Sequence, residues 1–198
     1  MFFPETVITG CGNPLYADDG FGPAVIQNLK TCVLPAGVKA IDTGTGGNEF
    51  VFSLLDPMVT RRLIVVDAAD FGAKPGSLTL INLSDLPAGG ITDHQPGGVA
   101  ETLLMMKDIK EILLLGCQPG MVTYPEMHIG LSPEVTSAIP LARLAILNIL
   151  HDSQPWSLIS DQGMMHDRSD SLLLPTHAVR WKQYQFFPCS TGYSSPGR

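Results

Sequence analysis

Three residues of this chain, Asp19, Asp67 and His94, have the types and positions needed to bind a divalent transition-metal ion. Asp19 follows the first predicted strand at the start of a predicted helix, and Asp67 directly follows the apolar run from Leu63 to Val66. Open α/β sheets bind ligands beyond the carboxyl ends of their strands, so we expect the two carboxylates to meet there. His94 stands in a turn-rich segment before another predicted helix. Two carboxylates and one imidazole form a plausible ligand set for such an ion.

Each of these residues also has a purely structural interpretation. Asp19, like its neighbour Asp18, is a suitable N-cap for the helix that follows. Asp67 is placed to accept hydrogen bonds from the backbone of the next loop. His94 on a polar loop is often simply exposed to solvent. The spacing does not decide between these roles, because the three residues are far apart in the sequence. His128, near a strand or loop edge, is predicted to be structural.

Composition and missing motifs exclude several classes of protein. The chain has 12 basic and 19 acidic residues, which disfavours non-specific binding of nucleic acid. The third glycine of a dinucleotide fingerprint is replaced by Leu15, and neither a phosphate loop nor a GxSxG nucleophile motif occurs. The four cysteines form no CxxC pair, so we expect reduced thiols in the cytoplasm. No apolar run suggests a membrane span or a secretory signal, so no membrane association is expected.

The alternation of apolar strands and amphipathic helices predicts an α/β fold with a mostly parallel sheet. The most polar strand, Ser77 to Leu83, is predicted to lie near a sheet edge. The last helix contains Pro140, which is expected to kink it. Strands are predicted over residues 6–9, 38–41, 63–66, 77–83 and 112–115, and helices over 21–29, 48–55, 98–110 and 133–149.

Several sequence blocks together resemble the hydrogenase maturation endopeptidases. They occur in the family's order, cover roughly residues 5 to 150, and are specific as a set rather than one by one. The first block most resembles the peptidases of coenzyme-F420-reducing hydrogenases. The blocks are Gly10 to Leu15 with Asp18 to Gly22, Asp42 to Gly47, Leu63 to Ala68, Asp93 to Gln95, and His128 to Val135.

The resemblance implies a fold and an activity. The fold would be a three-layer α/β/α sandwich around a twisted, mostly parallel sheet, of the phosphorylase/hydrolase-like type. Residues 1–150 would form the peptidase domain, and 151–198 a tail or extension of unknown role. The activity would be cytoplasmic removal of a C-terminal extension from the nickel-loaded large-subunit precursor of a nickel–iron hydrogenase. The family's two acidic ligands and its histidine fall on Asp19, Asp67 and His94, with nickel supplied by the precursor.

Three other functions remain open from the sequence. In an aspartic-type scheme, the class to which such endopeptidases are assigned, Asp19 and Asp67 would share one proton and His94 would be incidental. A non-catalytic metallochaperone or scaffold would use the same three ligands to grip the precursor without cutting it. An enzyme acting on a small anionic ligand would use Gly44 to Gly47 as an anion cradle.

Overall fold

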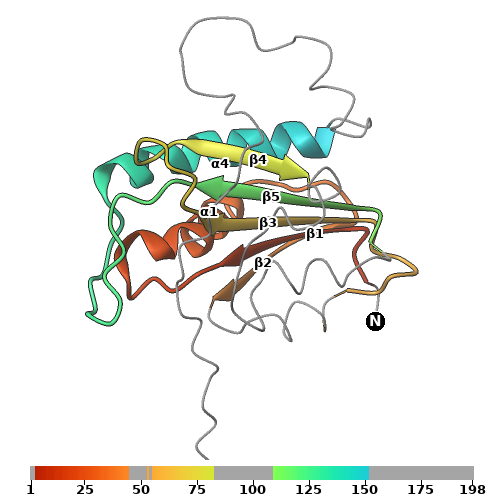
Figure 1. The fold of residues 1–198 in the computed structure, drawn as a ribbon. Helices are drawn as coiled ribbons and strands as arrows, with labels where there is room; N and C mark the ends of the chain where they lie inside the picture. The colour runs from red at the N-terminus through yellow and green to blue at the C-terminus, as the bar shows by residue number, and fades with distance from the viewer. Residues whose placement is uncertain (1–2, 45–52, 54, 83–108, 152–198) are drawn as a thin grey trace, which may run out of the picture.

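The computed structural model describes residues 3–44, 53, 55–82 and 109–151. Five strands and three helical segments are arranged along these residues (Figure 1). The strands are β1 (Thr6–Cys11), β2 (Val38–Gly44), β3 (Arg62–Ala68), β4 (Leu78–Asn82) and β5 (Glu111–Cys117). The helical segments are the 3-10 turn η1 (Ala17–Gly20) and the helices α1 (Phe21–Leu29) and α4 (Pro133–His151).

The strands form one sheet in the order β2-β1-β3-β5-β4. All neighbouring pairs are parallel except β4 with β5, which is antiparallel. The predicted α/β class, the mostly parallel sheet and the edge position of β4 are therefore confirmed. The carboxyl ends of β1, β2, β3 and β5 share one rim of the sheet, because parallel strands all run in the same direction.

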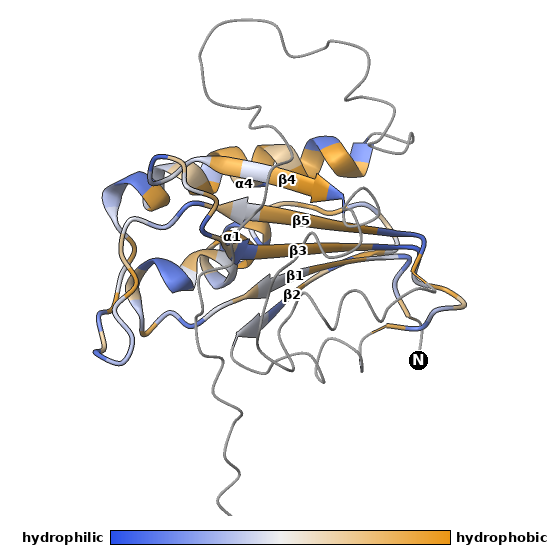
Figure 2. Ribbon diagram, viewed as in Figure 1, coloured by the Kyte–Doolittle hydropathy of each residue, from blue (hydrophilic) through white to orange (hydrophobic). Residues whose placement is uncertain are grey.

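Both faces of the sheet bury apolar side chains, and Figure 2 shows the apolar colouring of its central strands. Helices α1 and α4 pack together on the face that carries Ile8, Ile64 and Leu113. Val7, Val65 and Leu114 belong to the core of the other face. The helices predicted over 48–55 and 98–110, which would complete the second helical layer, fall almost wholly outside the described residues.

Helix α4 runs without interruption through Pro140. It is long and apolar enough to pass a length-and-composition test for a membrane span. Its stripe of Val135, Ala142 and Ile146 is fully buried against the sheet and α1, so it serves as a core helix here. The tail predicted from residue 151 onward lies outside the described residues apart from His151, which ends α4.

Four strands extend further than the sequence indicates, while β4 begins one residue later, at Leu78, than the predicted strand over 77–83. β2 continues to Gly44, and β3 and β5 each gain residues at both ends. Asp67 therefore lies inside β3 rather than after it. The prediction that Asp18 or Asp19 caps α1 is wrong, since the N-cap is Gly20 and no side chain caps the helix.

The close approach of α1 to the sheet depends on glycine. A Cβ at Gly22 would overlap the carbonyl oxygen of Cys11 and lie 2.5 Å from that of Val66. A Cβ at Gly10 would lie 2.5 Å from both the carbonyl oxygen of Gly22 and a side-chain carbon of Ile26. Helix and strand backbones therefore meet without side chains between them, which fixes the start of α1 directly behind the rim.

Replacing Gly22 by Ala should destabilise the protein by about 1–3 kcal/mol, although alanine favours helices, because the added methyl group overpacks this contact. Urea unfolding measures the change. Gln27→Ala, at an exposed position of the same helix, is the control and should shift stability by less than about 0.5 kcal/mol. Equal stability of Gly22→Ala and the parent protein would contradict the close packing.

Candidate metal and catalytic site

Asp19 reaches the rim through a tight turn between β1 and η1. Gly12 has φ +115°, and a Cβ there would overlap the carbonyl oxygen of Asp19. The Asn13 N–H donates to Asp19 Oδ2 at 2.7 Å, while Asn13 Oδ1 accepts from the Leu15 N–H at 3.0 Å. The turn therefore folds back on itself and fixes the position of the Asp19 carboxylate.

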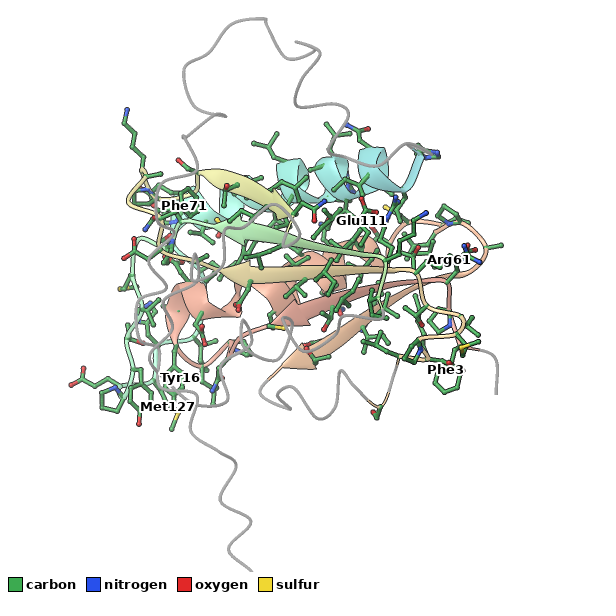
Figure 3. The ribbon with its side chains drawn as sticks, turned by 45° about the vertical axis from the view of Figure 1, so that its right-hand side comes forward. Phe3, Tyr16, Arg61, Phe71, Glu111 and Met127 are labelled. Carbon is green, nitrogen blue, oxygen red and sulfur yellow. The ribbon has the colours of Figure 1, made fainter. Side chains whose placement is uncertain are left out.

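Asp67 enters the same region from β3. It is only 4% exposed, and its Oδ1 accepts the Ala68 N–H at 2.8 Å. A Cβ on Gly12 would lie 3.6 Å from that oxygen. Gly12 therefore lies between the backbone of Asp19 and the carboxylate of Asp67, at a close approach that leaves no space for a side chain. Figure 3 shows the side chains around the carboxyl ends of these strands.

Burial and like charge perturb both acids. Desolvation raises the pKa of Asp19, opposed by the bond from Asn13. Burial raises the pKa of Asp67 well above its ordinary value, and the charge of Asp19 raises it further, against the bond from Ala68. The charge of Asp19, the less buried acid, therefore favours the protonated form of Asp67. Among the described residues, neither carboxylate forms a salt bridge.

A cation would suit this pair of acids. Two adjacent carboxylates without a basic partner repel each other when both are ionised, and a divalent ion between them would remove that repulsion. No cluster of three His, Cys, Asp or Glu side chains able to hold a metal occurs in the part of the chain that the structure describes. The third predicted ligand, His94, lies outside that part. The structure thus brings two of the three predicted site residues together and does not place the third.

Cys11 lines the same end of the sheet. Its thiol pKa is raised to about 12, chiefly by burial and next by the charge of Asp67. The sulfur lies 3.6 Å from Thr43 Oγ1, which bonds Thr9 Oγ1 at 2.8 Å and the Gly10 carbonyl at 2.9 Å. The thiol therefore stays protonated at neutral pH, as expected for a reduced structural cysteine. Asp42, the first residue of the glycine-rich block, accepts the Gly44 N–H at 2.9 Å.

Asp18 is a structural carboxylate that sequence reasoning treated only as a possible helix cap. It is completely buried and accepts hydrogen bonds from the N–H groups of Gly120, Met121 and Ser132 and from Ser132 Oγ, at 2.6–2.9 Å. These bonds tie η1 to the loop after β5 and to the start of α4. The sequence feature that could have revealed this role is the pair of adjacent acids, Asp18 and Asp19, in one short turn.

His128 is exposed and has a structural role, as predicted, through backbone hydrogen bonds to Leu15 and Ala17.

Comparisons with known proteins agree on one family for this chain. Residues 23–149 match the family model described as hydrogenase maturation protease. The chain belongs to this family. It is 38% identical over 148 residues to the coenzyme F420 hydrogenase subunit delta of Methanothermobacter thermautotrophicus, covering 73% of this chain and 93% of that protein.

Two further relatives agree with this assignment. A putative hydrogenase maturation protease of Methanocaldococcus jannaschii is 36% identical over 148 residues, covering 72% of this chain and 94% of that protein. The solved structure of the hydrogenase maturating endopeptidase HybD from E. coli superposes with a TM-score of 0.62 at 27% identity, over 74% of this chain and 91% of that one. The predicted family and its α/β fold are therefore confirmed.

For this maturation protease, the raised pKa of Asp67 predicts a pH-dependent stability. The folded state holds the Asp67 proton more tightly than the unfolded state does. That stabilisation is complete below about pH 4, the ordinary range of the carboxyl group, and is lost as pH rises through the higher pKa of the folded state. Asp67→Asn removes this titration, so the variant should gain stability relative to the parent as pH rises.

Urea unfolding at a series of pH values, with a chelator present, measures that difference. Asp56→Asn is the control, because the Asp56 side chain bonds the Met58 N–H in a turn before β3, at the opposite end of the strand. A stability difference between Asp67→Asn and the parent that stays constant across the series would contradict the assigned environment of Asp67.

Proposed function

We propose that this protease removes the C-terminal extension from the nickel-loaded large-subunit precursor of a nickel–iron hydrogenase in the cytoplasm. The observation that carries the proposal is the convergence of Asp19 and Asp67 at the carboxyl rim of the sheet. Membership of the maturation protease family supports the reaction class. The relative named coenzyme F420 hydrogenase subunit delta favours a precursor of an F420-reducing hydrogenase.

In this proposal nickel arrives with the precursor and is part of the substrate. A divalent ion beside the scissile amide polarises its carbonyl group and lowers the pKa of a bound water. Asp19 and Asp67 would supply oxygen ligands from one side, and His94 would supply the imidazole that suits nickel. Because the free protein then holds only part of a coordination shell, a precursor without nickel lacks the bridging ion and stays uncut. Cleavage would thus check that nickel has been inserted.

The environments of the two carboxylates suit different roles. Asp19 is half-buried and accepts the backbone N–H of Asn13, so it can exchange protons with a water at the rim. Asp67 is almost completely buried and fixed by Ala68. We therefore assign general-base function to Asp19 in addition to its ligand role, and a ligand role alone to Asp67.

Two competing functions make different predictions. An aspartic-type peptidase would share one proton between Asp19 and Asp67 and would cut the precursor in the presence of a chelator. The raised pKa of Asp67 beside an ionised Asp19 agrees with that scheme as well. A metallochaperone would bind nickel-loaded precursor and release it with its extension intact.

Mass spectrometry of the precursor after incubation with the protein distinguishes these functions. We expect a product shortened at its C-terminus from nickel-loaded precursor only. Asp19→Asn, Asp67→Asn and His94→Ala should each slow cleavage by about a hundredfold or more, because each removes a ligand or proton acceptor. The matched control Asp56→Asn should cleave at the parent rate.

Some outcomes would contradict the proposal. Equal cleavage of nickel-free precursor would favour the aspartic-type scheme. Binding without any shortened product would favour the metallochaperone. Normal rates in all three site variants would show that these residues are not the site.

A further inference from the structure

Large apolar side chains are exposed beside the candidate site, on two segments that are far apart in the sequence. Met127 and Ile129 are 74% and 80% exposed. Leu15, Met121 and Tyr124 are each about 40% exposed. Contiguous exposed apolar surface on a folded protein commonly marks a binding site. We call Leu15, Met121, Tyr124, Met127 and Ile129 the apolar rim.

Backbone bonds hold the two segments of the apolar rim together. The His128 N–H donates to the Leu15 carbonyl at 2.8 Å, and the Ala17 N–H donates to the His128 carbonyl at 2.8 Å. Met127 and Ile129 flank His128 in this extended bridge, so their side chains leave the backbone on the same side. The rings of Tyr16 and Tyr124 meet edge to face with centroids 5.1 Å apart. Figure 3 shows Tyr16 and Met127 close together on the same projecting part of the molecule.

Asp18 fixes this surface relative to the site. Its buried carboxylate accepts the N–H groups of Gly120 and Met121, at the start of the loop that carries the apolar rim. The next residue in the chain is Asp19. The short turn η1 therefore has two roles. Its Asp18 anchors the loop that carries the apolar rim, and its Asp19 is a candidate metal ligand. The loop is held in place before a partner arrives, which lowers the entropy cost of binding.

We propose that the apolar rim is the docking surface for the hydrogenase large-subunit precursor, next to the segment that is cut. This inference rests on the proposed function, and it commits to an apolar strip of the precursor as the occupant. The scissile segment must lie against Asp19, and an extended chain covers about 3.3 Å per residue. Leu15 precedes Asp19 by only four positions, so precursor residues near the cut reach the rim. The two methionines, Met121 and Met127, suit such a contact because their side chains adapt to an apolar partner.

The test uses the full chain and compares the double variant Met127→Ser/Ile129→Ser with the parent protein. Its readouts are kcat and KM for cleavage of nickel-loaded precursor, and the Kd for the precursor by biolayer interferometry. We expect KM and Kd to rise about tenfold or more, while kcat stays within twofold because neither residue belongs to the site. The matched control is Met58→Ser, which is 89% exposed in the turn before β3, at the opposite end of the strand. It should leave both constants unchanged.

Unchanged KM and Kd in the double variant, or an equal rise in Met58→Ser, would overturn the inference. The oligomeric state, measured by light scattering, tests whether a second copy of the chain occupies the rim instead of the precursor. If the parent is a dimer and the double variant a monomer with unchanged KM, a second copy of the chain occupies the rim and the inference fails. The proposed function fails separately, when the parent protein binds the precursor but never shortens it. In that case the ratio of the Kd values still decides whether the rim is the docking surface.

Discussion

The placement of two carboxylates at one end of a buried parallel sheet is the constraint on which the rest of this structure depends. Asp67 is carried there by β3, whose apolar residues fix its register between β1 and β5. Asp19 is carried there by a turn that only glycine at position 12 allows. Two desolvated acids are unfavourable when both are ionised, and the residues that the structure describes give this pair no salt bridge. A protein tolerates this arrangement at a site where a cation or a shared proton relieves it.

Asp18 and Asp67 show how one residue type can serve opposite purposes. Both are almost fully buried carboxylates. Asp18 is surrounded by donors from the loop after β5 and the start of α4, so its bonds hold separate segments together. Asp67 has the Ala68 N–H and faces the charge of Asp19. The first carboxylate accepts four hydrogen bonds within the fold, while the second accepts only the Ala68 N–H among the bonds of the described residues. Perturbed acids of the second kind are typical of functional sites.

Much of this arrangement can be predicted from local sequence patterns. The apolar runs of β3 and β5 predict strands buried on both faces, and the polar character of residues 77–83 predicts the edge strand. The helix cap could not be predicted, because an Asp before a helix looks the same whether its donors are local or come from residues more than a hundred positions away. The apolar rim depends on backbone bonds between Leu15, Ala17 and His128, and no periodicity reveals such a pairing. The role of His94 stays a prediction, since it lies outside the described residues.

The most direct measurement of the central claim is the pKa of Asp67 in the full chain, determined by carbon NMR titration of its carboxyl group with a chelator present. The pKa should fall in Asp19→Asn, because the like charge beside Asp67 is gone. It should still remain above the ordinary value, because Asp67 stays buried. An Asp67 pKa that is the same in the parent and in Asp19→Asn would show that the two acids do not meet, and would contradict the site proposed here.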